Sequence, residues 1–164
     1  VSEDIYDYIY VSQGKTKVDS IDDNEELEYT EDAFNVLGFA PEEKFDCYML
    51  TAGVMTCGGI EFKTKGRDDQ AECEDISEAS FPGKAAGAFQ IPAAAMIKAF
   101  CKPRIKVGTE WVVKGQTCEQ ATNAVGGGLE NATFEIDVLS LGIGRAIYDR
   151  VFKWLIEKCN DTLM

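Results

Sequence analysis

The spacing of apolar residues along the chain predicts several amphipathic helices. The clearest begins at Pro41, because proline in a first turn loses no helical hydrogen bond, and it ends at Gly58. Thr30 and Thr117, each followed by acidic or amide side chains, are typical N-caps. Further helices are therefore predicted over residues 30–37, 92–101, 117–124 and from 145 onward. The fold class we expect is mostly α, with one β-hairpin and short strands.

Two of these helices carry apolar side chains along one face, and we expect the first of the two helices to be core. In the helix after Pro41 they are Phe45, Tyr48, Met49, Ala52, Met55 and Thr56, and in the last helix they are Ile147, Tyr148, Val151, Phe152, Leu155 and Cys159.

The remaining segments favour other structures. Alternating tyrosines predict an extended segment over residues 2–12, and residues 60–63 predict a short strand. Residues 20–28 are acidic and predicted to be solvated, whereas residues 64–80 predict a long surface loop, a length typical of functional or disordered loops. Proline and two glycines make residues 81–89 a poor helix sequence.

A hairpin is predicted over residues 101–115. Basic and apolar residues alternate up to Val107, Gly108-Thr109 is a turn signal, and a β-prone run begins at Trp111. A two-residue loop would pair Val107 with Glu110 and mix charged and apolar side chains on both faces. We therefore expect a three-residue loop that pairs Val107 with Trp111.

That register separates the side chains into an apolar face and a basic face. The apolar face would hold Ile105, Val107, Trp111 and Val113, and the exposed face would hold Arg104, Lys106, Val112 and Lys114. The simpler interpretation, a surface hairpin with solvated lysines, stays open on this pattern alone.

The hairpin is basic, whereas the chain as a whole is acidic. The 164 residues carry 16 basic and 29 acidic side chains, a formal net charge of −13, yet residues 98–114 hold five basic residues and only Glu110 as an acid. The acidic excess argues against nucleic acid as a partner, which needs a broad basic surface. A local basic ribbon instead favours docking on an acidic protein surface.

Cysteines and glycosylation sequons leave a second interpretation open. Six cysteines and the sequons at Asn131 and Asn160 are compatible with an acidic binding module that is secreted and disulfide-linked. Against it, the chain has no Cys-x-x-Cys pair, no histidine, no recognisable leader and no apolar span long enough for a membrane. We expect reduced thiols, a cytosolic protein, no bound metal and no membrane partner.

Nucleotide chemistry finds no support in the chain. The SQGKT run at 12–16 lacks the glycine that a phosphate-binding loop needs at the position of Ile9, so we expect a turn there. A standalone small enzyme is the least favoured interpretation, because no histidine, paired carboxylates on a regular element or intact nucleotide motif occurs. We identify no catalytic residue.

Several motifs together resemble a known family. They are SQGKT at 12–16, SIDD at 20–23, DAFNVLGF at 32–39, KPRIKVG at 102–108 and YDRVFKWL at 148–155. In this order and spacing the chain resembles the motor head of a muscle-type (class II) myosin heavy chain. The resemblance covers nearly all of residues 1–164 and implies an internal segment of that α/β, P-loop NTPase-like head, between its two switches, with most of the upper 50-kDa region.

The resemblance implies binding to filamentous actin. The hairpin corresponds to the cardiomyopathy loop of that family, and residues 63–72 to a second actin-facing loop. The implied contact residues are Lys102, Arg104, Lys106, Val107, Gly108, Glu110, Lys114, Lys63, Lys65 and Arg67. The other implied partners are the rest of the head and, through a coiled-coil tail absent here, a second heavy chain. The implied location is the cytoplasm, in the myofibril.

The same resemblance limits the chemistry expected of the chain. ATP and Mg²⁺ would bind elsewhere in the head, because neither switch motif nor the phosphate-binding loop occurs in these residues. No cofactor is expected in this segment, which should not hydrolyse ATP by itself.

Three departures from the family pattern stand out. Residues 81–90 carry proline and glycines where such heads have a regular helix. Residues 54–58 read VMTCG where such heads usually read VMHMG, and residues 128–142 interrupt the run from AVGG to IGRA. The codons for residues 128–142 can contain splice signals, so we interpret this segment as a probable insertion, either a real surface loop or a translated intron. Sequencing the transcript across this junction distinguishes the two.

Overall fold

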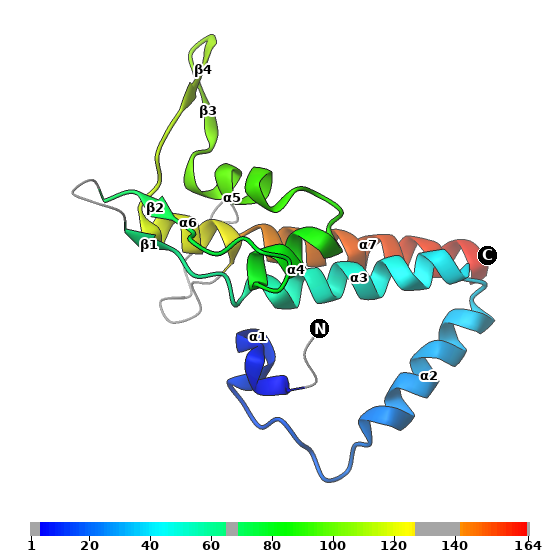
Figure 1. The fold of residues 1–164 in the computed structure, drawn as a ribbon. Coiled ribbons are helices and arrows are strands. Elements are labelled where there is room, and N and C mark those ends of the chain that lie inside the picture. Colours follow the sequence, from blue (N-terminus) through cyan, green and yellow to red (C-terminus); the bar gives the residue numbers. More distant parts are fainter. Residues whose placement is uncertain (1–3, 65–68, 127–141, 164) are drawn as a thin grey trace.

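The computed structural model describes residues 4–64, 69–126 and 142–163 of the chain (Figure 1). In chain order the elements are η1 (Ile5–Asp7), α1 (Ile9–Ser12), α2 (Asp23–Val36), α3 (Pro41–Cys57), β1 (Lys63–Thr64), β2 (Ala71–Glu72), α4 (Phe81–Ala88), α5 (Ala93–Cys101), β3 (Arg104–Val107), β4 (Glu110–Val113), α6 (Cys118–Val125) and α7 (Ile143–Leu163). The predicted class, mainly α with short strands, is confirmed. No helix in these described ranges is long and apolar enough to cross a membrane.

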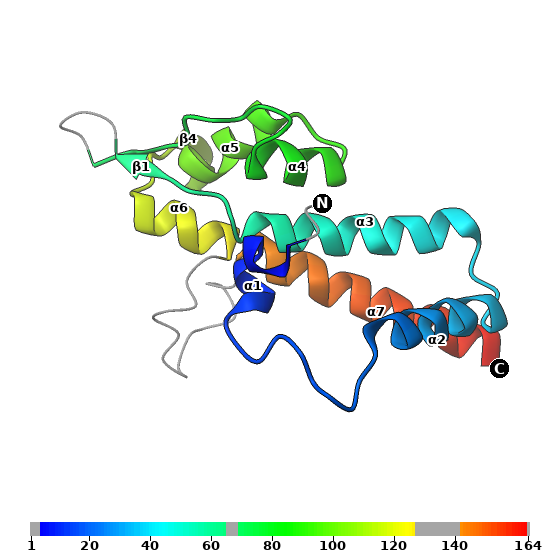
Figure 2. The same cartoon turned by 60° about the horizontal axis from the view of Figure 1, so that its bottom comes forward.

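Two long helices, α3 and α7, run side by side and support the rest of the molecule (Figures 1 and 2). Helices α4, α5 and α6 gather at one end of this pair, and α2 lies toward the other end. The core forms where the first group meets the end of α3. Its buried members are Cys57, Ile60, Ala71, Ala85, Ala86, Met96, Ile97, Phe100, Cys101, Ala121 and Val125.

Helix α3 begins at Pro41 and ends before Gly58, as predicted, and its predicted core face is confirmed in part: Thr56 is buried and Met49, Ala52 and Met55 are half-buried, whereas Tyr48 is exposed. Phe45 is 60% exposed, and the buried positions are Cys47, Gly53, Thr56 and Cys57. The ring of Phe89, which follows α4, lies where a Cβ on Gly53 would be. The small residue Gly53 lets the segment at the end of α4 approach α3 closely.

Helix α4 corrects the prediction that residues 81–89 form poor helix. The Ser80 hydroxyl accepts a hydrogen bond from the Gly83 N–H at 3.3 Å, and Pro82 lies in the first turn, where its missing N–H is not needed. Ala85 and Ala86 are buried against the core. The burial of this small helix outweighs the low helix propensity of its glycines.

Helix α2 begins seven residues before the predicted N-cap at Thr30. Asp22 caps it by accepting a hydrogen bond from the Asn24 N–H at 2.9 Å, while Thr30 lies inside the helix and donates to the Glu26 carbonyl. The acidic run forms its first turns, where negative charge is favourable at the positive end of the helix dipole. The prediction that this acidic run is solvated is confirmed, because residues 20–28 are all exposed.

The N-terminal segment also differs from its prediction. Residues 5–12 form a turn of 3-10 helix and one turn of α-helix instead of an extended segment. Only Tyr8 of the three alternating tyrosines is fully buried, edge-on to Phe81 at 6.4 Å between ring centroids. After α1 the chain bends at Gln13-Gly14, as the predicted turn requires.

Helices α5 and α6 match their predictions within one residue. Pro92 is the N-cap of α5. Thr117 and Gln120 exchange side-chain to backbone hydrogen bonds of 3.2 Å at the start of α6, and Gly126 ends it with φ of 111°, a conformation that favours glycine. The strand predicted over 60–63 is displaced to Lys63–Thr64, and residues 127–141, with most of the probable insertion, lie outside the described residues.

Helix α7 presents part of its predicted stripe to α3. Ile147, Val151, Leu155 and Cys159 are half-buried, one turn apart. Tyr148 is 58% exposed and Phe152 is 54% exposed, so the described residues leave these two members of the stripe uncovered. The stripe is therefore covered only in part.

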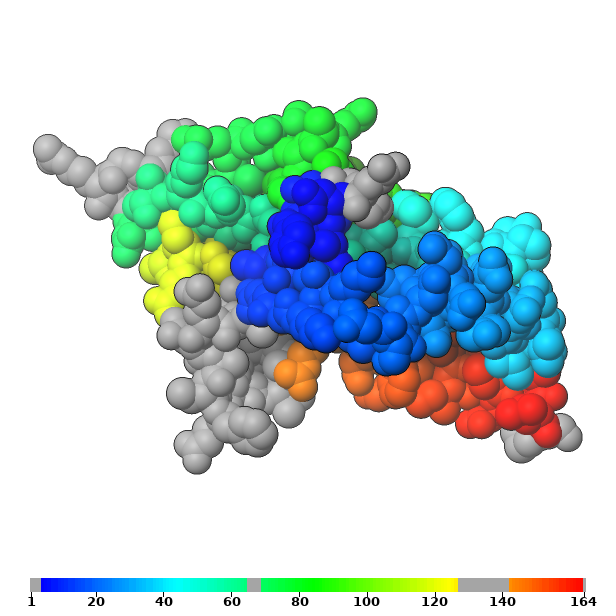
Figure 3. Space-filling view, turned by 90° about the horizontal axis from the view of Figure 1, so that it is seen from below, coloured from blue at the N-terminus to red at the C-terminus, as the bar shows by residue number. Residues whose placement is uncertain are grey.

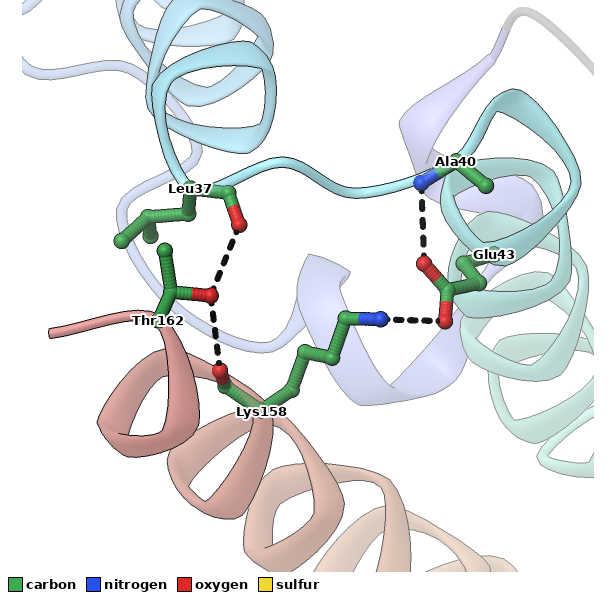
Figure 4. Close-up of polar contacts among 5 residues, drawn as sticks. All are labelled: Leu37, Ala40, Glu43, Lys158 and Thr162. Carbon is green, nitrogen blue, oxygen red and sulfur yellow. Dashed lines mark hydrogen bonds and ion pairs between the residues drawn. The ribbon is translucent and has the colours of Figure 1, made fainter. Parts of the chain in front are cut away.

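Polar contacts join the C-terminal end of α7 to the start of α3 (Figure 4). Lys158 Nζ donates to Glu43 Oε1 at 2.6 Å, and Glu43 Oε2 accepts from the Ala40 N–H at 2.8 Å. Thr162 Oγ1 donates to the Leu37 carbonyl at 3.0 Å. The hydrogen bond from Lys158, followed by that from Ala40, holds the pKa of Glu43 below its ordinary value of 4.5.

This ion pair predicts a loss of stability in acid. Because the pKa of Glu43 is lowered by folding, its contribution is present above pH 4.5 and is lost as the pH falls through the lower value of the folded state. As the pH is lowered from 6, the urea concentration at the unfolding midpoint should therefore begin to decrease near pH 4.5. The decrease should be less steep in Glu43→Gln. Glu42→Gln is the matched control, since it removes the neighbouring carboxylate. Equal pH profiles for the two variants would contradict the prediction.

Candidate functional site

The hairpin of β3 and β4 projects from the helical body (Figure 1). Its register pairs Lys106 with Trp111 and Val107 with Glu110, so Gly108 and Thr109 form a two-residue loop. The predicted three-residue loop is therefore wrong. Gly108 has φ of 62°, as the first central residue of a type II′ turn requires, and this turn matches the twist of the strands.

The prediction failed because it assumed that one face of the hairpin is buried. Register follows the apolar pattern only where a face is covered, and here every residue of both strands is exposed. Trp111 is 60% exposed and Val107 is 58% exposed. The turn, not burial, selects the register.

The observed register gives the hairpin two different faces. One face carries Arg104, Lys106, Trp111 and Val113, and the other carries Ile105, Val107, Glu110 and Val112. On the first face the Arg104 guanidinium lies over the Trp111 ring, 5.9 Å from its centroid. A cation held on an indole ring presents charge and apolar area together, and both are available to a partner.

The other predicted hairpin residues lie at the root. Lys102 is the exposed C-cap of α5, and Lys114 is exposed just after β4, where its N–H donates to the Pro103 carbonyl at 3.0 Å. The structure thus brings four basic side chains onto one exposed hairpin and its root.

The second predicted segment is only partly described. Lys63 is exposed in β1, and its ammonium lies 3.3 Å from the Glu74 carboxylate, an ion pair that the sequence did not indicate. Lys65 and Arg67 lie outside the described residues. Strands β1 and β2 are antiparallel, with Lys63 opposite Glu72, and they form a short ribbon.

A main-chain junction at Gln116, which sequence analysis missed, connects the two ribbons. The Gln116 N–H donates to the Cys101 carbonyl at 2.9 Å, and the Gln116 carbonyl accepts from the Ala71 N–H at 2.8 Å. No sequence signal marks such a junction, because backbone groups make both bonds. It places the start of β2 beside the chain that leaves β4.

Helix α2, which has an acidic first turn, lies on the opposite side of the molecule from the hairpin (Figure 1). Seen from below, the surface is formed largely by the N-terminal segment and α2, whose first turn carries Asp23, Glu25 and Glu26 (Figure 3). The basic hairpin is therefore directed away from the acidic first turn of α2, and further acidic side chains, among them Glu72 and Glu74, lie in and beside the β1–β2 ribbon (Figure 1).

All six cysteines are free thiols. Burial raises the pKa of the Cys57 thiol to about 12, and it also raises the pKa of Cys101. These thiols are protonated at neutral pH, so they are poor nucleophiles and poor metal ligands there. The structure offers no disulfide framework in support of a secreted module.

Two hollows occur on the surface of the described residues. A groove of about 360 Å³ lies between α2 and α7, and its lining is mainly apolar, with Phe34 and Leu155 among the residues. A second hollow of about 350 Å³ lies beside the base of β1 and β2. Among residues 4–64, 69–126 and 142–163, no group of three or more acidic or cysteine side chains is placed to hold a metal ion.

A family model described as the myosin head (motor domain) matches residues 1–164, the whole chain. The chain belongs to the myosin head family. This membership makes it a segment of an actin-based, cytoskeletal motor, whose general partners are actin and the remainder of the head. Exposed side chains such as Tyr148 and Phe152 on α7 are consistent with a segment of a larger head.

Proposed function

We propose that this myosin head segment binds the actin filament through its β3–β4 hairpin. The observation that carries the proposal is the exposed face on which Arg104, Lys106 and Trp111 lie together, in a chain that is otherwise acidic. Basic side chains on a projecting ribbon attract an acidic filament, and the indole ring adds apolar area at the contact. Lys102 and Lys114 extend the positive charge to the root of the hairpin.

The β1–β2 ribbon is proposed as a second contact with the filament. Lys63 is its described basic residue, and Lys65 and Arg67 follow it in the sequence. The Glu74 carboxylate partly neutralises Lys63, so we assign this ribbon a smaller share of the binding energy than the hairpin.

The finer identity is also a proposal. The motifs quoted above support a muscle-type, class II heavy chain and the upper 50-kDa region of its P-loop NTPase-like head. A class II chain would dimerise through a coiled-coil tail, join thick filaments and work in the cytoplasm of muscle. ATP and Mg²⁺ would bind to other parts of the head, so this segment would report filament contact and would not perform hydrolysis.

Cosedimentation with actin filaments tests the proposed contact. We expect the purified chain to pellet with filaments at roughly 25 mM salt and substantially less at roughly 150 mM, because screening weakens contacts between exposed charges. A sample without filaments controls for aggregation through the exposed apolar side chains. A chain that circular dichroism shows to be folded, yet that stays in the supernatant at both salt concentrations, would disprove the proposal for the isolated segment.

A further inference from the structure

The two ribbons that we propose as filament contacts share one attachment point. Gln116 lies between them and bonds to both sides: its N–H to the Cys101 carbonyl at the root of the β3–β4 hairpin, and its carbonyl to the Ala71 N–H in β2. The Lys114 N–H, two residues earlier, closes the hairpin root by bonding to the Pro103 carbonyl. The chain leaving β4 is therefore hydrogen-bonded first to its own hairpin and then to the other ribbon.

Side-chain packing reinforces this junction from two directions. A Cβ added to Gly115 would lie 2.9 Å from Cδ of Gln70, so the absence of a side chain at Gly115 lets the end of the Gln70 side chain pack against the junction. On the other strand, Thr64 Oγ1 lies 3.3 Å from Cys118 Sγ, at the first residue of α6. Ala71 is fully buried beneath the junction.

We propose that the two ribbons form one rigid composite docking surface, coupled through the main chain of Gln116, for the acidic filament. This inference rests on the proposed function, and it adds that the two contacts engage together and not independently. It also assigns a positioning role to Gln116, which carries no charge and belongs to neither ribbon.

The consequence for affinity follows from the cost of ordering a surface. If the ribbons moved independently, each would have to be immobilised at the filament separately, and each immobilisation would oppose binding. When one ribbon is already fixed relative to the other, the second contact forms at a high effective concentration. The small contribution from Lys63 then adds to that from Arg104 and Lys106 without a further ordering cost.

Substitution at Gln116 isolates this role. Gln116→Pro removes the N–H that donates to Cys101, whereas the matched control Gln116→Ala removes the side chain and keeps both main-chain bonds. The proline variant keeps the carbonyl that accepts from the Ala71 N–H, but the segment that carries this carbonyl is no longer bonded to Cys101. In the free protein we therefore expect the Ala71 amide to exchange with solvent about fivefold faster in Gln116→Pro than in Gln116→Ala, the factor that corresponds to the lost backbone hydrogen bond. Equal exchange rates in the two variants would overturn the assignment of Gln116 as the junction.

Filament binding then tests the composite surface. We expect Gln116→Pro to bind actin filaments about fivefold more weakly than Gln116→Ala, with Lys63→Ala costing less affinity in the proline background than in the alanine background. Gly115→Val keeps every N–H but displaces the Gln70 side chain that packs against the junction. It should act in the same direction, and it replaces the proline variant if that variant does not fold.

The outcomes separate the two proposals. If no variant and not even the unmodified chain binds filaments, the proposed function fails, and the composite surface fails with it. If all bind, but Gln116→Pro and Gly115→Val match Gln116→Ala in affinity, the proposed function stands and the coupling is overturned. A loss of filament affinity that occurs only in Gln116→Pro and Gly115→Val supports both the proposed function and the coupling.

Discussion

Reversing the charge of Arg104 and Lys106 together should reduce filament binding at least about tenfold at low salt. Both side chains lie on the face of the hairpin that also carries Trp111, and both are exposed. The double change to glutamate replaces two attractions with two repulsions at an acidic partner, and it also removes the cation that lies over the indole ring. Cosedimentation over a range of filament concentrations measures the loss.

The chain offers a matched control for this change. Lys15 and Lys17 are also exposed and also two residues apart, in the segment between α1 and α2. Lys15→Glu with Lys17→Glu alters the net charge by the same amount at a site away from the hairpin, so its filament affinity should stay close to that of the unmodified chain. A control that loses as much affinity as the hairpin variant would show that net charge, and not the hairpin, governs binding.

Substituting Gly83 with alanine should destabilise the chain by about 1–3 kcal/mol. A Cβ on Gly83 would overlap the Ser77 carbonyl group and lie 2.8 Å from the Cα of Glu78. These are backbone atoms, which cannot move aside without disturbing the loop whose Ser80 caps α4. Urea unfolding measures the effect as a lower midpoint with an unchanged slope.

Gly87, in the same short helix, supplies the opposite result. It is exposed, and a Cβ there would meet nothing within 4 Å. Gly87→Ala should therefore stabilise the chain by about 0.5–1 kcal/mol, because alanine loses less backbone entropy in a helix. If both alanine variants shifted the midpoint in the same direction, the close approach at Gly83 would not be the cause.

Signals that act within a few residues were sufficient to predict much of the secondary structure. Pro41 and Gly58 bound α3, the Thr117–Gln120 pair starts α6 and Gly126 ends it, since each fixes a dihedral angle or satisfies a terminal hydrogen bond locally. The same reasoning failed at α2. Both Asp22 and Thr30 are good caps, and choosing between them requires knowing which residues continue the helix.

The candidate site was predictable in its composition but not in its geometry. The sequence placed Arg104, Lys106 and Trp111 on one hairpin, because alternation and a glycine turn are local features. The sequence could not place these three side chains on one face, because the face of each side chain depends on the strand register. The register in turn depended on whether either face of the hairpin is buried. The ion pair of Lys63 with Glu74 depends on the antiparallel pairing of β1 with β2, and local sequence signals did not predict it.

The sequence by itself determined the main helix boundaries, the hairpin and its basic charge, and the motifs that resemble a myosin head, since all of these depend on residue types at short spacing. Only the tertiary structure decided that α4 is a helix, that the small residues of α3 form its packed face, and that Gln116 joins the two ribbons. The physical reason is common to all three. Burial and main-chain hydrogen bonding between distant segments depend on which surfaces come into contact. Local helix and strand propensities do not determine these tertiary contacts.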